Sequence, residues 1–154
     1  MKVKIKILDE KAQIPKKAHV SDAGFDLTAT SFHYDEYGCS VYGTGLAFEI
    51  PQGYVGLIFP RSSNAKKDLI LTNCVGVIDS GYRGEVMFKF KPLMYWGGLN
   101  HKPTARHEMG NYLYEIGDRI GQLIIMPIPE IEFCEVSELT DSDRGNNGYG
   151  STGK

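Results

Sequence analysis

The chain has 154 residues, a length typical of one domain with its own core, and a net charge of −2 from 17 basic and 19 acidic residues. This balance excludes a nucleic-acid-binding surface that works through bulk positive charge, so an anionic substrate would need local positive charge. The three cysteines are widely spaced, which excludes a disulfide framework and a CxxC metal site and predicts reduced thiols in or near the core of a cytoplasmic protein.

The N-terminal half reads as a series of short strands. Apolar residues alternate with lysines over residues 2–8, the period of a half-buried strand, and without a continuous apolar run we expect neither a signal peptide nor a membrane span. A second short strand is expected at 21–29. Residues 32–59 predict further strands, the last two of them joined by a Pro-Gln-Gly turn at 51–53.

One short helical segment follows these strands. Ser62 and Ser63 suit N-capping of one or two helical turns, and Arg61 lies beside them. Capping serines and a phosphate contact are equally compatible with this pattern. Residues 69–73 then predict another strand.

Residues 76–86 (GVIDSGYRGEV) combine an acid and an aromatic residue with turn formers. Apolar arms at 74–78 and 86–90 flank this stretch, which predicts a β-hairpin with Asp79 and Tyr82 at its tip. Taken alone, the pattern also fits an ordinary Asp-Ser-Gly turn with a surface tyrosine.

The region after the hairpin is an extended loop at 93–112. His101 and His107 in this loop lack further spaced ligands, so solvated histidines are favoured over a metal site. An apolar strand is predicted at 120–126, in which Gln122 needs hydrogen-bond partners or a ligand.

The C-terminus changes character. Residues 130–136 predict a last strand, and residues 143–154 form a glycine-rich tail with an arginine, a tyrosine and two hydroxyl residues. The GxxxxGK at 148–154 is not a P-loop, because no Ser or Thr and no helix follow it. We expect a mobile tail able to close over a base and a phosphate chain.

These elements predict an all-β, jelly-roll-like domain with one short helix. Five stretches in chain order resemble the five motifs of the homotrimeric dUTP pyrophosphatase (dUTPase) family: 23–27 (AGFDL), 60–63 (PRSS), 76–84 (GVIDSGYRG), 117–123 (GDRIGQL) and 144–153 (RGNNGYGSTG).

The resemblance implies a distorted, β-clip-like jelly roll over residues 1–140, a flexible lid at 141–154, and a homotrimer whose subunits share three active sites. The implied activity is hydrolysis of dUTP to dUMP and pyrophosphate by water attack on the α-phosphorus with Mg²⁺. This reaction keeps uracil out of DNA and supplies dUMP for dTMP synthesis. No nucleic-acid or membrane partner is implied.

The resemblance also implies roles for the residues around the predicted hairpin. Asp79 would meet the sugar 3′-hydroxyl and orient the attacking water. Tyr82 would pack under the deoxyribose, where a ribose 2′-hydroxyl would collide with it. Asn73 and the backbone of Val77 and Ile78 would read the uracil edge.

A second group would hold the phosphates. By resemblance, Arg61, Ser62 and Ser63 lie along the α,β region of the triphosphate, and Gln122 hydrogen-bonds near it. Asp26, the acid of the first motif, would hold Mg²⁺ through water, with no direct protein ligand to the metal.

The tail would close the site. Arg144, Ser151 and Thr152 would hold the γ-phosphate, Tyr149 would stack on the base, and Gly150 completes the binding segment. The family usually has phenylalanine where this chain has Tyr149, which keeps the stacking face.

The chain departs from the family pattern at Ser63-Asn64, where many members have Gly-Leu, and in its long 93–112 loop. A related dCTP deaminase needs a glutamate at the position aligned with Lys89, and Glu85 lies too early in the chain. A non-catalytic or moonlighting protein-binding module, using the 93–112 loop, is the alternative of another class.

Overall fold

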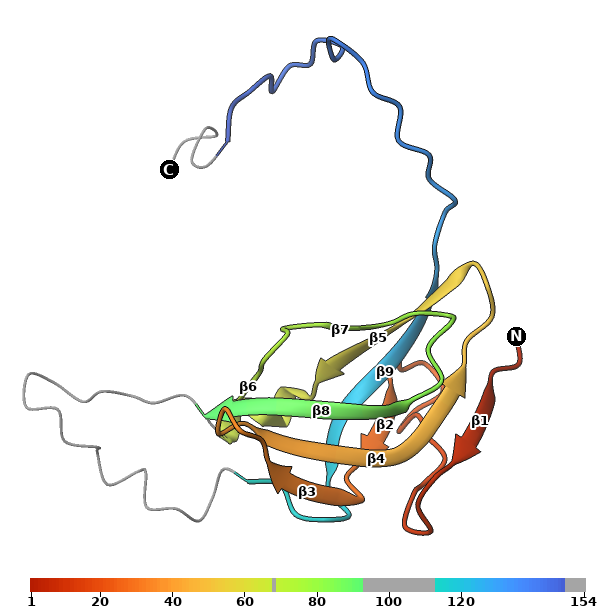
Figure 1. Ribbon diagram of the computed structural model, residues 1–154, viewed down its shortest axis with the longest axis vertical. Coiled ribbons are helices and arrows are strands. Elements are labelled where there is room, and N and C mark those ends of the chain that lie inside the picture. The colour runs from red at the N-terminus through yellow and green to blue at the C-terminus, as the bar shows by residue number, and fades with distance from the viewer. Residues whose placement is uncertain (68, 93–112, 149–154) are drawn as a thin grey trace, which may run out of the picture.

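The computed structural model describes residues 1–67, 69–92 and 113–148, and these residues form two antiparallel β-sheets (Figure 1). Sheet A has the strand order β1-β4-β8-β6, and β3 pairs with β4 beside this path. Its strands are β1 (Lys4–Ile7), β3 (Ser31–Tyr34), β4 (Ser40–Glu49), β6 (Leu69–Leu71) and β8 (Glu85–Pro92).

Sheet B has the strand order β2-β9-β5-β7. Its strands are β2 (Phe25–Thr28), β5 (Tyr54–Pro60), β7 (Gly76–Ile78) and β9 (Arg119–Pro127). A single 3₁₀ helix, η1 (Ser62–Lys66), follows β5 and leads back to sheet A through β6. The predicted strands at 2–8, 21–29, 32–59, 69–73 and 120–126 are therefore confirmed, although β1, β2 and β6 are shorter than predicted and β9 is longer.

The longest strand, β4, is the centre of sheet A and pairs with β1, β3 and β8. A register shift in its middle forms an irregularity at Gly45, whose φ of 65° favours glycine. The Glu85 carboxylate accepts the Gly45 N–H at 2.7 Å, and the Thr44 hydroxyl donates to the Val86 carbonyl at 2.7 Å. These bonds satisfy polar groups that the irregularity leaves outside the ladder.

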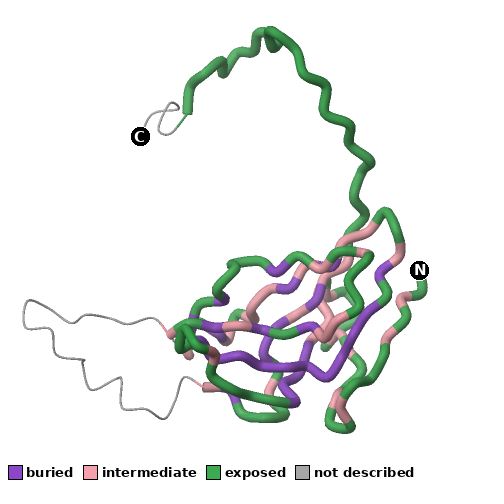
Figure 2. The backbone as a smooth tube through the Cα atoms, viewed as in Figure 1, coloured by how far each residue is buried: buried purple, intermediate pink, exposed green. Residues whose placement is uncertain are grey.

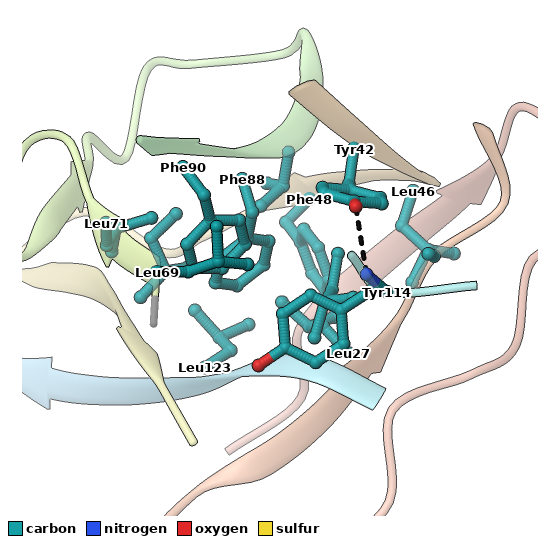
Figure 3. Close-up of a cluster of buried hydrophobic side chains, with 14 of the residues drawn as sticks. Leu27, Tyr42, Leu46, Phe48, Leu69, Leu71, Phe88, Phe90, Tyr114 and Leu123 are labelled. Carbon is teal, nitrogen blue, oxygen red and sulfur yellow. Dashed lines mark hydrogen bonds between the residues drawn. The ribbon is translucent and has the colours of Figure 1, made fainter. Parts of the chain in front are cut away.

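The core lies between the two sheets (Figure 3). Phe88, Phe90 and Tyr42 contribute from sheet A, and Leu27 and Leu123 contribute from sheet B. Their burial provides the main stabilisation of the domain, since apolar area removed from water is the dominant favourable term in folding. The predicted all-β class with one short helix is confirmed.

The predicted hairpin at 74–90 is wrong in one respect. Its first arm became β7 and pairs with β5 in sheet B, while its second arm became β8 and pairs with β4 and β6 in sheet A. The alternation of side chains predicts strands but not their partners, and each arm found a partner elsewhere. The tip still turns, because Tyr82 N–H donates to the Asp79 carbonyl at 3.0 Å.

The predicted strand at 130–136 is also absent among the described residues. Residues 128–148, here called the C-terminal arm, extend away from the sheets without strand pairing (Figures 1 and 2). Phe133 and Leu139 in the arm are 95% and 88% exposed. An alternating sequence needs a neighbouring strand, and the described part of this chain offers none to the arm.

Two smaller expectations are corrected. Arg61 occupies the N-cap position of η1 and no side chain caps it, so Ser62 and Ser63 are not capping residues. The cysteines are free as expected, but only Cys39 is buried, whereas Cys74 and Cys134 are exposed. The long loop at 93–112 lies outside the described residues, and none of the described helices is long and apolar enough to cross a bilayer.

Candidate active site

Sheet B places residues from three of the motifs side by side. In the β2–β9–β5 register, Asp26 lies opposite Gln122, and Gln122 lies opposite Phe59, two residues before Arg61. The strands thereby bring together a set of polar residues, here called the Asp26 cluster: Asp26, Arg61, Ser62, Ser63, Arg119 and Gln122.

Asp26 links two arginines in this cluster. Its Oδ1 accepts from Arg61 Nε at 3.0 Å, and its Oδ2 accepts from Arg119 Nη1 at 2.8 Å. The Asp26 and Arg61 side chains are mostly buried, which strengthens their charge-assisted hydrogen bond relative to an exposed pair. Asp26 thus fixes the direction of both guanidinium groups.

Gln122 is held at its amide. Its Nε2 donates to the Pro60 carbonyl at 3.2 Å. A Cβ at Gly24 would lie 2.3 Å from the Gln122 Oε1, so only glycine leaves room for the amide oxygen there. The hydrogen-bond partner expected for Gln122 is therefore the Pro60 carbonyl at the end of β5, and Gly24 of the first motif leaves room for the amide oxygen.

The two serines lie in the first turn of η1. Ser62 is exposed, and the Ser63 hydroxyl accepts a long hydrogen bond of 3.4 Å from Arg61 Nη1. The cluster therefore presents hydroxyl groups beside a fixed guanidinium, a set of donors suited to phosphate oxygens.

A cavity of about 630 Å³ borders the Asp26 cluster and carries local positive charge. Lys16, Lys17 and Arg119 line it together with Asp26. Sequence reasoning missed these three basic residues. Lys16 and Lys17 lie just before the first motif, and the pairing of Arg119 with Asp26 spans 93 positions in the chain.

The second group of predicted residues is the tip loop, residues 79–84, which follows β7. The Tyr82 hydroxyl donates to the Glu85 carbonyl at 3.0 Å, and a Cβ at Gly84 would lie 2.4 Å from that hydroxyl oxygen. Arg83 Nη1 donates to the carbonyls of Ser80 and Tyr82 at 2.6 and 2.9 Å. The loop is thus shaped by local hydrogen bonds, while Asp79 and Tyr82 remain exposed.

Asn73 precedes the tip loop at the turn between β6 and β7. A Cβ at Gly76 would lie 3.2 Å from Asn73 Nδ2, so the Asn73 amide lies along the start of β7. Cys74 between them has a φ of 59°, which is uncommon for a residue other than glycine. Val77, 61% exposed, and the partly buried Ile78 lie between Asn73 and Asp79 on β7.

A single chain does not bring the two groups together. Ile78, next to Asp79, pairs with Gly56 near the start of β5, whereas Arg61 follows the end of that strand. The four residue steps from Gly56 to Pro60 alone span roughly 13 Å. Figure 1 shows η1 and the loop after β7 at opposite ends of the domain.

Arg144 lies far along the C-terminal arm, where its Nε donates to the Asn147 carbonyl at 3.1 Å. The other predicted tail residues, Tyr149, Gly150, Ser151 and Thr152, lie outside the described residues. Among the described residues, no three His, Cys, Asp or Glu side chains gather into a metal-binding group.

The chain is similar to known proteins over its full length. The family model described as dUTPase matches residues 10–93. Deoxyuridine 5′-triphosphate nucleotidohydrolases from Corynebacterium glutamicum and Nautilia profundicola are 40% and 42% identical to it, over 99% and 100% of this chain and 95% and 100% of theirs.

Solved structures give the same result. The dUTPase of Staphylococcus bacteriophage 80alpha with dUPNHPP superposes with a TM-score of 0.79 at 30% identity over 99% of both chains. The dUTPase of phage phi11 of S. aureus, described with a species-specific insert, gives a TM-score of 0.72 at 27% identity over 90% of this chain and 98% of its own. With a family model matched over residues 10–93 and relatives 40% and 42% identical over almost their whole length, the chain belongs to the dUTPase family.

Proposed function

We propose that this protein is a dUTP diphosphatase that hydrolyses dUTP to dUMP and pyrophosphate by attack of water on the α-phosphorus. The observation that carries the proposal is full-length membership of a family of named dUTP hydrolases, with motif residues Asp26 and Gln122 paired on sheet B and Arg61 directly after β5. The reaction would keep uracil out of DNA and supply dUMP for dTMP synthesis.

We propose a homotrimer as the active form. The Asp26 cluster and the tip loop lie at opposite ends of β5, so a complete site needs the tip loop of a second subunit. The outer face of sheet B supports an interface, since Val77 and Met126 are 61% and 47% exposed there. The unpaired C-terminal arm supports it further, because an arm that leaves its own domain can reach a neighbouring one.

Within such a site, Asp79 would meet the 3′-hydroxyl of the sugar and orient the attacking water. Tyr82 would pack under the deoxyribose, and the ring would exclude a ribose 2′-hydroxyl. Asn73 and the backbone groups of Val77 and Ile78 would hydrogen-bond the uracil edge. Most of the acceleration would come from positioning and electrostatics, since phosphoryl transfer leaves little covalent chemistry to the protein.

The phosphates would lie against the Asp26 cluster. Arg61, Ser62 and Ser63 would contact the α,β region and Gln122 would bind beside them. Arg61 is supported in this role by its ion pair with Asp26, which fixes the guanidinium before the substrate arrives.

The tail would complete the site as a lid. We propose that residues 1–140 form the catalytic domain and residues 141–154 the lid, in which Arg144, Ser151 and Thr152 hold the γ-phosphate. Tyr149 would stack on the base and Gly150 would lie between the two. Exposure along the whole described part of the arm supports a segment free to close on a neighbouring subunit.

Members of the family depend on a divalent metal ion, and we propose Mg²⁺. Asp26 already accepts two guanidinium groups, one on each oxygen, and each carboxylate oxygen keeps a lone pair for a water molecule. This fits Mg²⁺ held by phosphate oxygens and water, with Asp26 in outer contact, since Mg²⁺ dehydrates reluctantly. When bound, the ion would neutralise charge on the triphosphate.

Two alternatives have less support. A dCTP deaminase would need a glutamate where Lys89 pairs with Asp35, and the Glu85 carboxylate is already bound to the Gly45 N–H. A binding module without catalysis would have no need of intact Asp79 and Arg61. Protein binding through residues 93–112 stays a prediction.

Three free thiols support the cytoplasm as the compartment.

The test is pyrophosphate release by the purified protein with Mg²⁺ and dUTP, dCTP, UTP or dTTP as substrate. We expect turnover of dUTP alone. Ammonia release from dCTP would favour the deaminase, and no turnover of any nucleotide would favour a binding module.

A further inference from the structure

Asn64 is a buried polar residue in a segment whose neighbours are proposed to bind phosphate. It is 8% exposed and lies in η1, directly after Ser63. Its Nδ2 donates to the Leu69 carbonyl at 2.6 Å, and its Oδ1 accepts from the Tyr114 hydroxyl at 3.1 Å. A buried amide is costly unless paired, so these two bonds decide where η1 can lie.

Tyr114 provides the fixed end of this pair. It is 6% exposed, its backbone N–H donates to the Tyr42 hydroxyl at 3.0 Å, and its ring meets that of Tyr42 edge to face at 5.8 Å (Figure 3). Burial raises the pKa of Tyr114 to about 12, so the hydroxyl stays a neutral donor at physiological pH. The donor to Asn64 is therefore anchored in the core.

Lys67 adds a third contact between the same two segments. Its Nζ donates to the Leu113 carbonyl at 2.7 Å and lies 4.9 Å from the centre of the Tyr114 ring. Backbone bonds connect it to the site, since Lys67 N–H donates to the Asn64 carbonyl and Asn64 N–H donates to the Arg61 carbonyl, each at 2.9 Å. A continuous path of hydrogen bonds thus runs from the core to Arg61.

We propose that Asn64 and Tyr114 are positioning residues that hold the Arg61–Ser63 turn in place for the triphosphate. The proposal rests on the proposed dUTP hydrolysis and adds two residues that touch no substrate atom. Asn64 is also one of the two residues, Ser63 and Asn64, by which the second motif departs from the Gly-Leu of many family members. The chain therefore fixes this turn with a polar pair.

The test compares Tyr114→Phe with Tyr34→Phe, a matched control at a tyrosine that is exposed on β3. Loss of the hydroxyl leaves the Asn64 oxygen unpaired, so we expect the KM for dUTP and the Ki of pyrophosphate to rise about fivefold. The Ki of 2′-deoxyuridine, which has no phosphate and relies on the tip loop, should change less than about twofold. Tyr34→Phe should change none of these constants.

Asn64→Ala completes a double-mutant cycle. If the two residues act as one pair, Asn64→Ala with Tyr114→Phe should raise the pyrophosphate Ki no further than Asn64→Ala alone. A lower melting temperature with an unchanged Ki of pyrophosphate would reduce the pair to a structural role and overturn the proposal. Independent, additive effects would also overturn it.

Lys67→Met is the second variant, for the case that Tyr114→Phe does not fold. It removes the bond to the Leu113 carbonyl and the contact with the Tyr114 ring, and we expect the pyrophosphate Ki to rise about twofold. An unchanged Ki would overturn the proposal. The wild-type protein is assayed first. Absence of dUTP turnover in that assay would refute the proposed function and would not bear on the role of Asn64 and Tyr114.

Discussion

The Asp26 cluster and the tip loop are both parts of the proposed site, but they are built in different ways. The cluster is joined by side-chain ion pairs between β2, β9 and the residue after β5. The tip loop is held by hydrogen bonds to backbone carbonyls within residues 79–85, and its Asp79, Tyr82 and Arg83 side chains are exposed.

The difference follows from what each region is proposed to bind. A triphosphate demands converging positive charges, and these need a counter-charge such as Asp26 while the site is empty. A sugar and a base are recognised by shape and backbone hydrogen bonds, which a short loop can provide. Substitutions in the tip loop should therefore affect turnover alone, whereas substitutions in the cluster should affect turnover and stability.

The largest expected effect is that of Asp79→Asn. In the described part of the chain the exposed Asp79 side chain forms no hydrogen bond or ion pair with another residue, so the melting temperature should not change. Loss of the carboxylate that orients the water should lower kcat about 10³-fold with little change in dUTP binding. Steady-state pyrophosphate release measures kcat and calorimetry measures the affinity for dUTP. Glu10→Gln, at an exposed position, is the control. Near-normal turnover would remove Asp79 from the mechanism.

Deletion of residues 143–154 should have the second-largest effect. It removes Arg144 and the other proposed γ-phosphate contacts, and kcat should fall by about 100-fold. The assembly should persist, because the proposed interface on sheet B is untouched. Light scattering and the same activity assay measure the two outcomes. Full activity of the truncated protein would contradict the lid.

Asp26→Asn tests the cluster. The substitution removes the charge that pairs with Arg61 and Arg119, so unfolding should become easier by about 1 kcal/mol. The released guanidinium groups should also raise the KM for dUTP about tenfold. Chemical denaturation measures the free energy of unfolding, and steady-state kinetics measures the KM for dUTP. A change in KM without a change in stability would contradict the contrast with the tip loop.

Tyr82→Ala tests the specificity of the tip loop. Removal of the ring should leave the fold intact and relax discrimination against UTP about tenfold, because the 2′-hydroxyl no longer meets it. Tyr82→Phe is the control, since it loses only the bond to the Glu85 carbonyl and keeps the ring. The ratio of kcat/KM for dUTP and UTP is the measurement. An unchanged ratio would show that Tyr82 does not exclude ribose.

The sequence predicted the strands and the residue types of the site better than it predicted their neighbours. The period of two located β1 and β2, and an apolar run located β9, yet neither pattern could show that residues 74–78 and 86–90 pair in different sheets. Residues 130–136 have the same period and no partner strand in the described chain. Periodicity is a local property, whereas pairing depends on the whole fold.

In the site, too, the sequence predicted the residue types better than the contacts between them. The motifs predicted that Asp26, Arg61 and Gln122 act together, and the β2–β9–β5 register places them side by side. They did not predict that Arg119 binds Asp26 or that Asn64 is held by Tyr114, because these contacts join residues 93 and 50 positions apart. Long-range side-chain contacts leave no periodic signal in a single sequence.

The smallest effect concerns an ion pair outside both regions, between Asp35, which directly follows β3, and Lys89 on β8 of sheet A. Hydrogen bonding to Lys89 holds the pKa of Asp35 below its ordinary value, and the same bond raises the pKa of Lys89. The pair therefore stabilises the fold between about pH 4 and pH 10. This stability is lost as the pH falls through the lowered Asp35 pKa or rises through the raised Lys89 pKa. Asp35→Asn should flatten both limbs of the melting temperature against pH and leave kcat at neutral pH unchanged. A change in kcat would show that sheet A also influences the chemistry. We do not expect this, because the Asp26 cluster and the tip loop both adjoin sheet B.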